Sequence, residues 1–222
     1  MENYFKRQIQ LWGVEKQLSL REKSILIVGS GGLGSSLALA LGSVGIGQIT
    51  LVDFDEVEIH NIHRQIAFSL KDQGRSKAKV VKERIESRSH YTEVQSFEES
   101  FEEFSGRDLE FDLIFDGTDN LDTRNRIDEY AKKIGIPWVY GSVESFFGYV
   151  GFFEKAPFRT FQIMEKGVLG VAAPMVMQVA SLQANIGLRY LVGEDTFKES
   201  LYTLSFENDG SFATKKFKMP VE

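Results

Sequence analysis

The segment from Ser24 to Val52 carries no charged residue, which meets the length expected of a membrane-spanning helix. Four glycines between Gly29 and Gly34 argue against a continuous helix, because each would cost a helix interior about 1 kcal/mol relative to alanine. The pattern instead predicts a strand "SILIVG", a glycine turn, a helix "SSLALALGSVG" and a second strand "QITLVDFD". These elements make a βαβ unit whose first strand is buried on both faces.

The alternation of apolar runs and helical patterns continues to about residue 141. It predicts a helix over 76–89, a strand near Val94, a strand "FDLIFDG", a helix after Asn120 and a strand "PWVYGSV". The acidic stretch "EESFEEFSGRDLE" is expected to form a solvated helix face. Beyond residue 141 the pattern predicts aromatic strands broken by glycine, an apolar helix over about 173–192 and a hairpin that turns at 208–210.

We therefore predict an α/β fold. A Rossmann-like, doubly wound and mainly parallel sheet is expected, continued by antiparallel strands in the C-terminal half. With 222 residues, of which 42% are hydrophobic, the chain suits one domain with a substantial core. A net charge of -6 gives no basic field for nucleic acid, so we expect no nucleic-acid partner.

The chain contains no cysteine, which excludes disulfides, iron–sulfur clusters, thiolate zinc sites and a cysteine nucleophile. Its first residues, "MENYFKRQIQLWG", include an acidic residue and no unbroken apolar run, so they do not read as a secretory signal. We expect a cytoplasmic protein without membrane association.

A glycine-rich loop and an acidic residue indicate an adenine nucleotide. The sequence "GSGGLG" fits G-x-G-x-x-G, follows a predicted strand and opens a predicted helix, which is the context that the motif requires. Its glycines let backbone N–H groups and a helix N-terminus approach a phosphate. Asp53 ends the next strand, where an acid typically binds a ribose hydroxyl. A P-loop is excluded because the chain has no Gly-Lys dipeptide, but NAD and ATP both remain open.

Polar and basic residues after Asp53 favour a triphosphate over a dinucleotide. Asn61, Arg64 and Gln65 lie in "EIHNIHRQ", and Lys77 follows at the expected start of a helix. The glycine loop already serves an NAD pyrophosphate, so additional fixed cations suit a triphosphate better. Either cation taken alone is more often a solvated surface residue.

Two carboxylates in "FDGTDN" end a strand at the expected carboxyl edge of the sheet, where doubly wound folds bind ligands. Asp119 beside bound phosphates would suit Mg2+, which takes one or two carboxylates together with phosphate oxygens. The alternative is that Asp119 only caps the helix that contains Asn120–Tyr130. Asp116 is expected to support the turn.

Six segments in this order resemble the ThiF/MoeB/HesA family, and ThiF most: "RQIQLWG", "GSGGLGS", "LVDFDEVEIHNIHRQ", the lysine of "GRSKAKV", "DGTDN" and "SLQA". The resemblance covers nearly the whole chain. It implies one adenylation domain over 1–222, with a nucleotide-binding half (1–140) and a partner-binding half (141–222). It also implies an ATP- and Mg2+-dependent homodimer that adenylates the C-terminal glycine of a ubiquitin-like sulfur carrier ending in Gly-Gly.

The resemblance also assigns roles to individual residues. Catalytic roles fall on Arg7, which would reach into the partner subunit's ATP site, and on Arg64, Lys77 and Asp119, the last as the Mg2+ ligand. Nucleotide-binding roles fall on Gly29, Gly31, Gly32, Gly34, Asp53, Asp55, Asn61, Gln65 and Asn120.

The chain departs from the family in two places. Many relatives hold a structural zinc through two C-x-x-C pairs, which this chain lacks, so no zinc is expected. Some relatives carry a cysteine that links covalently to the carrier, and the equivalent position here is Ile163. We therefore expect a separate protein to donate the sulfur.

Two other interpretations of the function remain open, and several aromatic residues are candidates for docking the partner. One is an NAD(P)-linked oxidoreductase, although an acid–base residue is not evident, and the other is a non-catalytic subunit, although Arg64, Lys77 and Asp119 are all present. A thiamine-pathway carrier is the first candidate substrate and a molybdopterin-pathway carrier the second. Candidates for the docking surface are Phe146, Phe147, Phe152, Phe153, Phe158 and Phe161, although most aromatics in alternating runs belong to the core.

Overall fold

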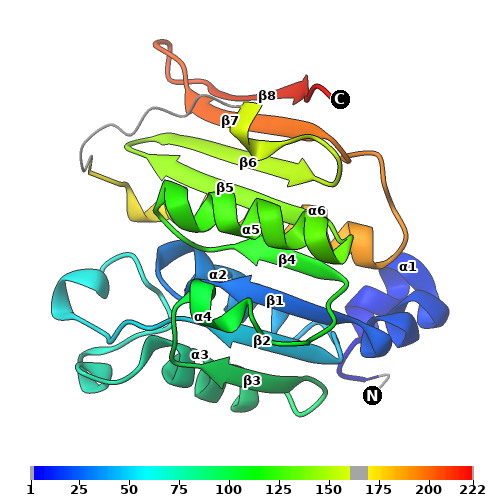
Figure 1. Ribbon diagram of the computed structural model, residues 1–222, viewed down its shortest axis with the longest axis vertical. Coiled ribbons are helices and arrows are strands. Elements are labelled where there is room, and N and C mark those ends of the chain that lie inside the picture. The colour runs from blue at the N-terminus through cyan, green and yellow to red at the C-terminus, as the bar shows by residue number, and fades with distance from the viewer. Residues whose placement is uncertain (1–2, 161–169, 222) are drawn as a thin grey trace.

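A computed structural model describes residues 3–160 and 170–221. Eight strands of this described part form one sheet in the order β3-β2-β1-β4-β5-β6-β7-β8 (Figure 1). The first five strands pair in parallel and the remaining pairs are antiparallel, as the sequence predicts. The strands are β1 (Ser24–Val28), β2 (Gln48–Val52), β3 (Glu93–Phe97), β4 (Leu113–Asp116), β5 (Trp138–Glu144), β6 (Phe147–Phe153), β7 (Ser200–Phe206) and β8 (Phe212–Lys218).

Helices cover both faces of the sheet. One face packs against α2 (Gly32–Leu41), α3 (Lys77–Glu86) and α6 (Ala173–Leu191), and the other against α4 (Phe101–Phe104) and α5 (Leu121–Ile134). An additional helix, α1 (Lys6–Ser19), precedes the sheet, and single 3-10 turns are η1 (Leu20–Glu22), η2 (Ile59–Asn61), η3 (Leu70–Asp72) and η4 (Phe158–Thr160). No helix among the described residues combines the length and hydropathy that a membrane crossing requires.

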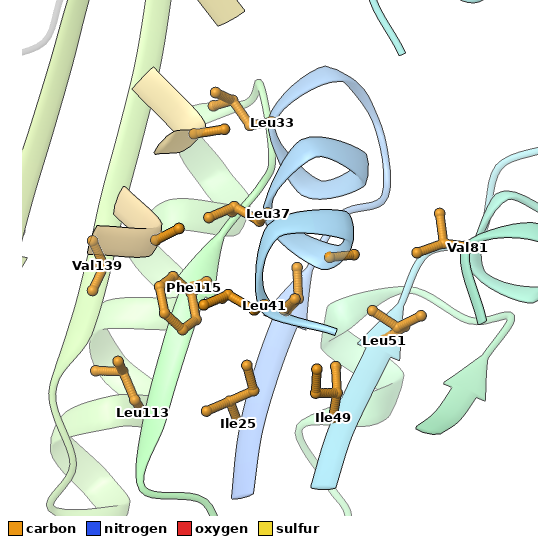
Figure 2. Close-up of a cluster of buried hydrophobic side chains, with 14 of the residues drawn as sticks. Ile25, Leu33, Leu37, Leu41, Ile49, Leu51, Val81, Leu113, Phe115 and Val139 are labelled. Carbon is orange, nitrogen blue, oxygen red and sulfur yellow. The ribbon is translucent and has the colours of Figure 1, made fainter. Parts of the chain in front are cut away.

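Strand β1 is buried on both faces because its side chains alternate between two hydrophobic clusters. Ile25 and Ile27 belong to the cluster under α2, α3 and α6, whereas Leu26 and Val28 belong to the cluster under α4 and α5. Figure 2 shows the first cluster, in which the leucines of α2 lie over the apolar side chains of the central strands. Burying one such leucine contributes about 1.5–3 kcal/mol. This packing fixes α2, and with it the glycine loop, against the sheet.

The predicted turns and caps account for several element boundaries. The Asn120 side chain accepts a hydrogen bond from the Thr123 N–H at 2.8 Å and caps α5, which ends at Gly135 in a left-handed conformation. The predicted hairpin joins β7 to β8, with Gly210 at a φ of 82°. Helix α2 begins at Gly32, earlier than predicted, so part of the glycine motif forms its first turn.

The structure adds detail to two expectations for the chain's segments. The boundary proposed at residue 141 falls inside β5, which pairs with β4 on one side and β6 on the other, so the two halves share one sheet. In the acidic stretch, Phe101 and Phe104 of the one-turn helix α4 are buried, whereas the glutamates between them are exposed. The solvated helix face is therefore limited to a single turn.

Candidate functional site

A cavity of about 780 Å³ lies at the carboxyl ends of β1, β2 and β4. The N-terminus of α2 forms one wall, the segment after β2 forms another, and the end of β5 with Gly170, Val171 and Val176 closes a third. This is the edge at which doubly wound sheets bind ligands. Of the predicted site residues, those that line it are Gly29, Gly31, Gly32, Asp53, Asp55, Arg64, Gln65, Lys77, Asp119 and Asn120.

The glycines of the loop have two different roles. Gly29 has a φ of 87°, and a Cβ at Gly34 would lie 1.8 Å from the Gly29 carbonyl oxygen, so both positions are fixed by the chain's own packing. At Gly31 a Cβ would meet only the Gln65 Nε2 atom, at an ordinary 3.5 Å. Gly31 is the residue before α2, whose first turn has no side-chain cap. The free N–H groups of this turn can therefore receive an anion.

Asp53 is buried beside this loop, and backbone groups hold both of its carboxylate oxygens. Oδ2 accepts a hydrogen bond from the Ser30 N–H at 2.5 Å, and Oδ1 accepts one from the Asp55 N–H at 2.7 Å. Burial raises the pKa of Asp53 against the lowering effect of these two hydrogen bonds and of Lys77. Each oxygen retains a lone pair for a hydroxyl donor such as that of a ribose.

The two predicted phosphate cations have different surroundings. The Lys77 Nζ lies 2.7 Å from the Asp55 Oδ2, and the Lys77 N–H also donates to the Asp55 carbonyl oxygen at 3.0 Å. Asp55 therefore holds Lys77, in addition to lining the cavity. Arg64 donates to the carbonyl oxygen of His60 at 3.1 Å and to Asn61 Oδ1 at 3.4 Å. No carboxylate of the described residues forms an ion pair with Arg64, so its guanidinium is available to bind an external anion.

The turn after β4 is supported by a buried ion pair. Asp116 Oδ1 accepts hydrogen bonds from the N–H and the hydroxyl of Thr118, as expected of a turn-supporting carboxylate, and its Oδ2 accepts one from Arg124 Nε at 3.0 Å. Burial by itself would lower the pKa of Arg124, but Asp116 outweighs this effect and raises it. Asp119 remains exposed on the cavity rim, and the alternative that it caps α5 is wrong because Asn120 does so.

Three predicted residues do not line the cavity within one chain. Gly34 acts through packing, and the side chain of the buried Asn61 accepts a hydrogen bond from Arg64. Arg7 is exposed on α1, and its Nη1 donates to Gln10 Oε1 at 3.2 Å. In Figure 1 α1 lies at the amino ends of the central strands, opposite the cavity edge. Within one chain Arg7 therefore does not reach the cavity, and its role in the site of a second subunit stays a prediction.

Two residues that the sequence reading did not assign complete the site. Arg124 lines the cavity and also donates to the carbonyl oxygens of Thr118 and Gly141. Gln183, fully buried on α6, donates to the Asp116 carbonyl oxygen at 2.8 Å. Arg124 shares a helical face with Ile127 and Ala131, and this spacing was the available signal that it points inward.

Three of the six candidate docking aromatics belong to the core. Phe152 and Phe153 alternate from β6 into the clusters on either face of the sheet, and Phe158 of η4 packs into the same cluster as Phe153. These three side chains are buried, so they are not docking residues. Phe146 and Phe147 are exposed at the β5–β6 turn. Phe161 and Ile163 lie outside the described residues.

The residues of the site fit a nucleotide with bound Mg2+, both in the ligand atoms that they offer and in the buried polar atoms that they leave without a partner. Ser30 Oγ and Gln65 Oε1 are buried and have no hydrogen-bond partner in the described part of the chain. No group of three His, Cys, Asp or Glu side chains among the described residues could hold a metal ion. A single carboxylate such as that of Asp119 is enough for Mg2+, because this ion binds few carboxylates and completes its coordination shell with water and phosphate oxygens.

Comparison with known proteins identifies relatives in sequence. The profile of the ThiF family matches residues 5–220. A Mycobacterium tuberculosis protein named probable adenylyltransferase/sulfurtransferase MoeZ is 33% identical over 90% of this chain and 58% of its own length. A probable molybdopterin-synthase adenylyltransferase from Porphyra purpurea is 31% identical over 90% and 57%, respectively. A sulfur carrier protein adenylyltransferase from Thermus thermophilus is 32% identical over 82% and 73%.

Solved structures confirm the fold. The crystal structure of Escherichia coli MccB with AMPCPP and MccA has a TM-score of 0.86 at 19% identity, covering 100% of this chain and 73% of that one. This chain spans little more than half the length of the Mycobacterium and Porphyra relatives. The profile match over nearly all of the sequence, together with identities above 30% to curated relatives, shows that the chain belongs to the ThiF family.

Proposed function

We propose that this chain transfers the adenylyl group of ATP to the C-terminal glycine carboxylate of a ubiquitin-like sulfur carrier and releases pyrophosphate. The observation that carries the proposal is a single cavity that contains the uncapped N-terminus of α2, the buried Asp53, and the cations Arg64 and Lys77. The names of the Mycobacterium and Thermus relatives support adenylyl transfer, and that of the Thermus protein supports a sulfur carrier as substrate.

The reaction needs orientation and charge stabilisation more than acid–base chemistry. An oxygen of the carrier carboxylate attacks the α-phosphorus, the bond from that phosphorus to the bridging oxygen breaks, and pyrophosphate leaves with the bonding electrons. A carboxylate is already ionised at neutral pH, so no general base is required. Asp53 would hold the ribose, the α2 N-terminus would hold phosphate oxygens, and Arg64 and Lys77 would stabilise charge that moves onto pyrophosphate. Mg2+ held by Asp119 would neutralise phosphate charge when bound.

The balance of charge in the cavity supports a contribution from a second copy. Its described lining includes five carboxylates and three fixed cations, namely Asp53, Asp55, Glu99, Asp119 and Glu144 against Arg64, Lys77 and Arg124. Asp55 pairs with Lys77, Glu99 pairs with Arg107 from outside the lining, and Asp116 pairs with Arg124. A triphosphate therefore needs further positive charge, which Mg2+ and Arg7 from the other subunit of a homodimer would provide.

Arg7 can be tested by mixing two inactive variants. A heterodimer of Arg7→Ala and Lys77→Ala would contain one site with both residues intact. Random subunit exchange would then restore about a quarter of the wild-type rate, because half of the dimers are mixed and each has one complete site. A mixture as inactive as its components would refute the contribution from the second subunit.

The identity of the carrier is the finer part of the proposal. We place a thiamine-pathway carrier first, from the resemblance to ThiF, and a molybdopterin-pathway carrier second, which the name of the Porphyra relative favours. Because the chain has no cysteine, sulfur would reach the acyl-adenylate from a separate donor protein.

An open sheet face beside the cavity suits the folded part of the carrier. Figure 1 shows α5 over β4 and β5, whereas no α-helix of the described chain covers β6 to β8 on that side. Phe147 and Tyr149 alternate along β6, and Leu201 pairs with the half-exposed Phe217 across β7 and β8. The extended C-terminal tail would pass from this face into the cavity beside β5.

ATP–pyrophosphate exchange with candidate Gly-Gly-ending carriers tests the proposal. We expect exchange that needs the carrier's last glycine, and losses of about 100- to 1,000-fold in Lys77→Ala and Arg64→Ala. The matched control is Lys79→Ala, since Lys79 is exposed on the same helix and pairs with Glu98. Near-normal exchange in both cavity variants would contradict the proposal. Oxidation of NADH with no response to ATP would favour an oxidoreductase instead.

A further inference from the structure

The connection from β3 to α4 lies where the base of a bound nucleotide would be. The Asp53 N–H donates to the Phe97 carbonyl oxygen at 3.1 Å, which places this connection beside the residue that would hold the ribose. In the sheet order, β3 and β2 lie on one side of β1, whose glycine loop would hold the phosphates. A nucleotide that runs from the glycine loop across Asp53 therefore directs its base toward the cavity lining formed by Phe54, Glu99 and Phe101.

Glu99 is a fixed, ionised acceptor in this part of the cavity. Its side chain is 22% exposed, and its two oxygens accept hydrogen bonds from Arg107 Nε and Nη2 at 2.7 and 2.9 Å. The Arg107 guanidinium in turn lies over the Phe97 ring, 4.8 Å from its centroid. The hydrogen bond from Arg107 lowers the pKa of Glu99. Each oxygen of a carboxylate has two lone pairs, so Arg107 leaves one on each for a ligand.

We propose that Glu99 selects the base of the nucleotide, by accepting a hydrogen bond from the 6-amino group of adenine. In a base with a keto oxygen at that position, this oxygen would face the carboxylate of Glu99. Both groups are acceptors, so neither would find a hydrogen-bond donor. This inference rests on the proposed nucleotide site, and it makes Glu99 a residue that determines specificity without taking part in adenylyl transfer.

Comparing ATP with ITP tests the contact, because inosine replaces the 6-amino group of adenosine with a keto oxygen and carries a proton on N1 instead. We expect the wild-type protein to bind ATP roughly 10- to 100-fold more tightly than ITP. In Glu99→Gln the ratio should fall severalfold toward one, since an amide can present either a donor or an acceptor. Calorimetric titration with each magnesium nucleotide measures the ratio without a carrier.

Two control variants separate base selection from local stability. Glu98→Gln makes the same change one residue earlier, at a side chain that pairs with Lys79 and does not line the cavity, and should leave the ratio unchanged. Arg107→Gln removes the anchor but keeps the carboxylate, so a preference for ATP should persist. If Arg107→Gln abolished the preference as fully as Glu99→Gln, Glu99 would be an anchor only and the inference would be wrong.

The result separates this inference from the proposed function. A protein that prefers ATP over ITP but adenylates no carrier would retain the role of Glu99 and lose the proposed reaction. A protein that adenylates a carrier equally with both nucleotides would retain the reaction and overturn the role of Glu99. An unchanged ratio in Glu99→Gln, or no binding of either nucleotide, would also overturn it.

Discussion

Replacing Arg124 with leucine should destabilise the protein strongly, although the new side chain is apolar and the site is buried. The substitution removes the partner of Asp116, which has no exposed surface, and frees the carbonyl oxygens of Thr118 and Gly141. Breaking a buried ion pair by removing one partner typically costs 3–5 kcal/mol, because the remaining charge is left uncompensated. Asp116 retains two hydrogen bonds from Thr118, so we expect a loss near the lower limit, about 3 kcal/mol.

Urea unfolding of each variant at neutral pH measures this loss as a difference in the free energy of unfolding. Arg126→Leu is the matched control, because Arg126 lies two positions further along α5, is half exposed and pairs with the exposed Glu102. It should change stability by less than about 0.5 kcal/mol. Adding Asp116→Asn to Arg124→Leu removes the buried charge and should restore about 1 kcal/mol or more.

Two outcomes would refute this reasoning. One is a loss below about 1 kcal/mol in Arg124→Leu, which would mean that Asp116 is adequately solvated or neutralised without its partner. The other is a double variant no more stable than the single one. If the expected result holds, the nucleotide affinity of Arg124→Leu should also fall, because the turn that carries Asp119 loses its support.

Further predictions concern the glycine loop and the response to acid. Gly34→Ala should prevent the loop from forming, since its Cβ would overlap the Gly29 carbonyl oxygen, whereas Gly31→Ala should keep the wild-type melting temperature and lose nucleotide affinity. Burial opposes ionisation of Asp72, but hydrogen bonds from Ser69 and the charge of Arg84 outweigh it and hold the pKa of Asp72 below its ordinary 3.8. Its stabilisation is therefore complete above the unfolded-state pKa and is lost as pH falls through the lower folded-state value, so the stability difference from Asp72→Asn should shrink below about pH 4.

The sheet could be predicted because the local sequence of each buried strand is itself apolar. Each central strand is a short apolar run between glycines or polar residues, and such runs in a βαβ order restrict the topology. Helix α1 gave no comparable signal. Among the described residues of α1, only Gln17 is buried, and Gly13, with a φ of 87°, interrupts the helix. A helix held to the domain by few apolar contacts has no apolar stripe from which to predict it.

The candidate site was predictable only where a residue's role is set by its neighbours in sequence. The glycine loop and Asp53 follow strands directly, so their position at the sheet edge can be read from the sequence order. The helical spacing of Arg124 with Ile127 and Ala131 indicates that Arg124 points inward, and Arg124 is buried whereas Arg126 is exposed. The spacing does not indicate what Arg124 binds there, because its ion pair with Asp116 and its contacts with two carbonyl oxygens exist only after β4, β5 and α5 have packed together.

Pairing within the cavity also changes what the cations can do. In the sequence, Arg64 and Lys77 look like equivalent phosphate ligands, but Lys77 already balances Asp55, whereas among the described residues the partners of Arg64 are uncharged oxygens. A phosphate that approaches Lys77 competes with the repulsion of Asp55, and one that approaches Arg64 does not. Arg64 should therefore contribute more to initial nucleotide binding, while Lys77, held rigidly by Asp55, is better suited to the charge that develops on departing pyrophosphate.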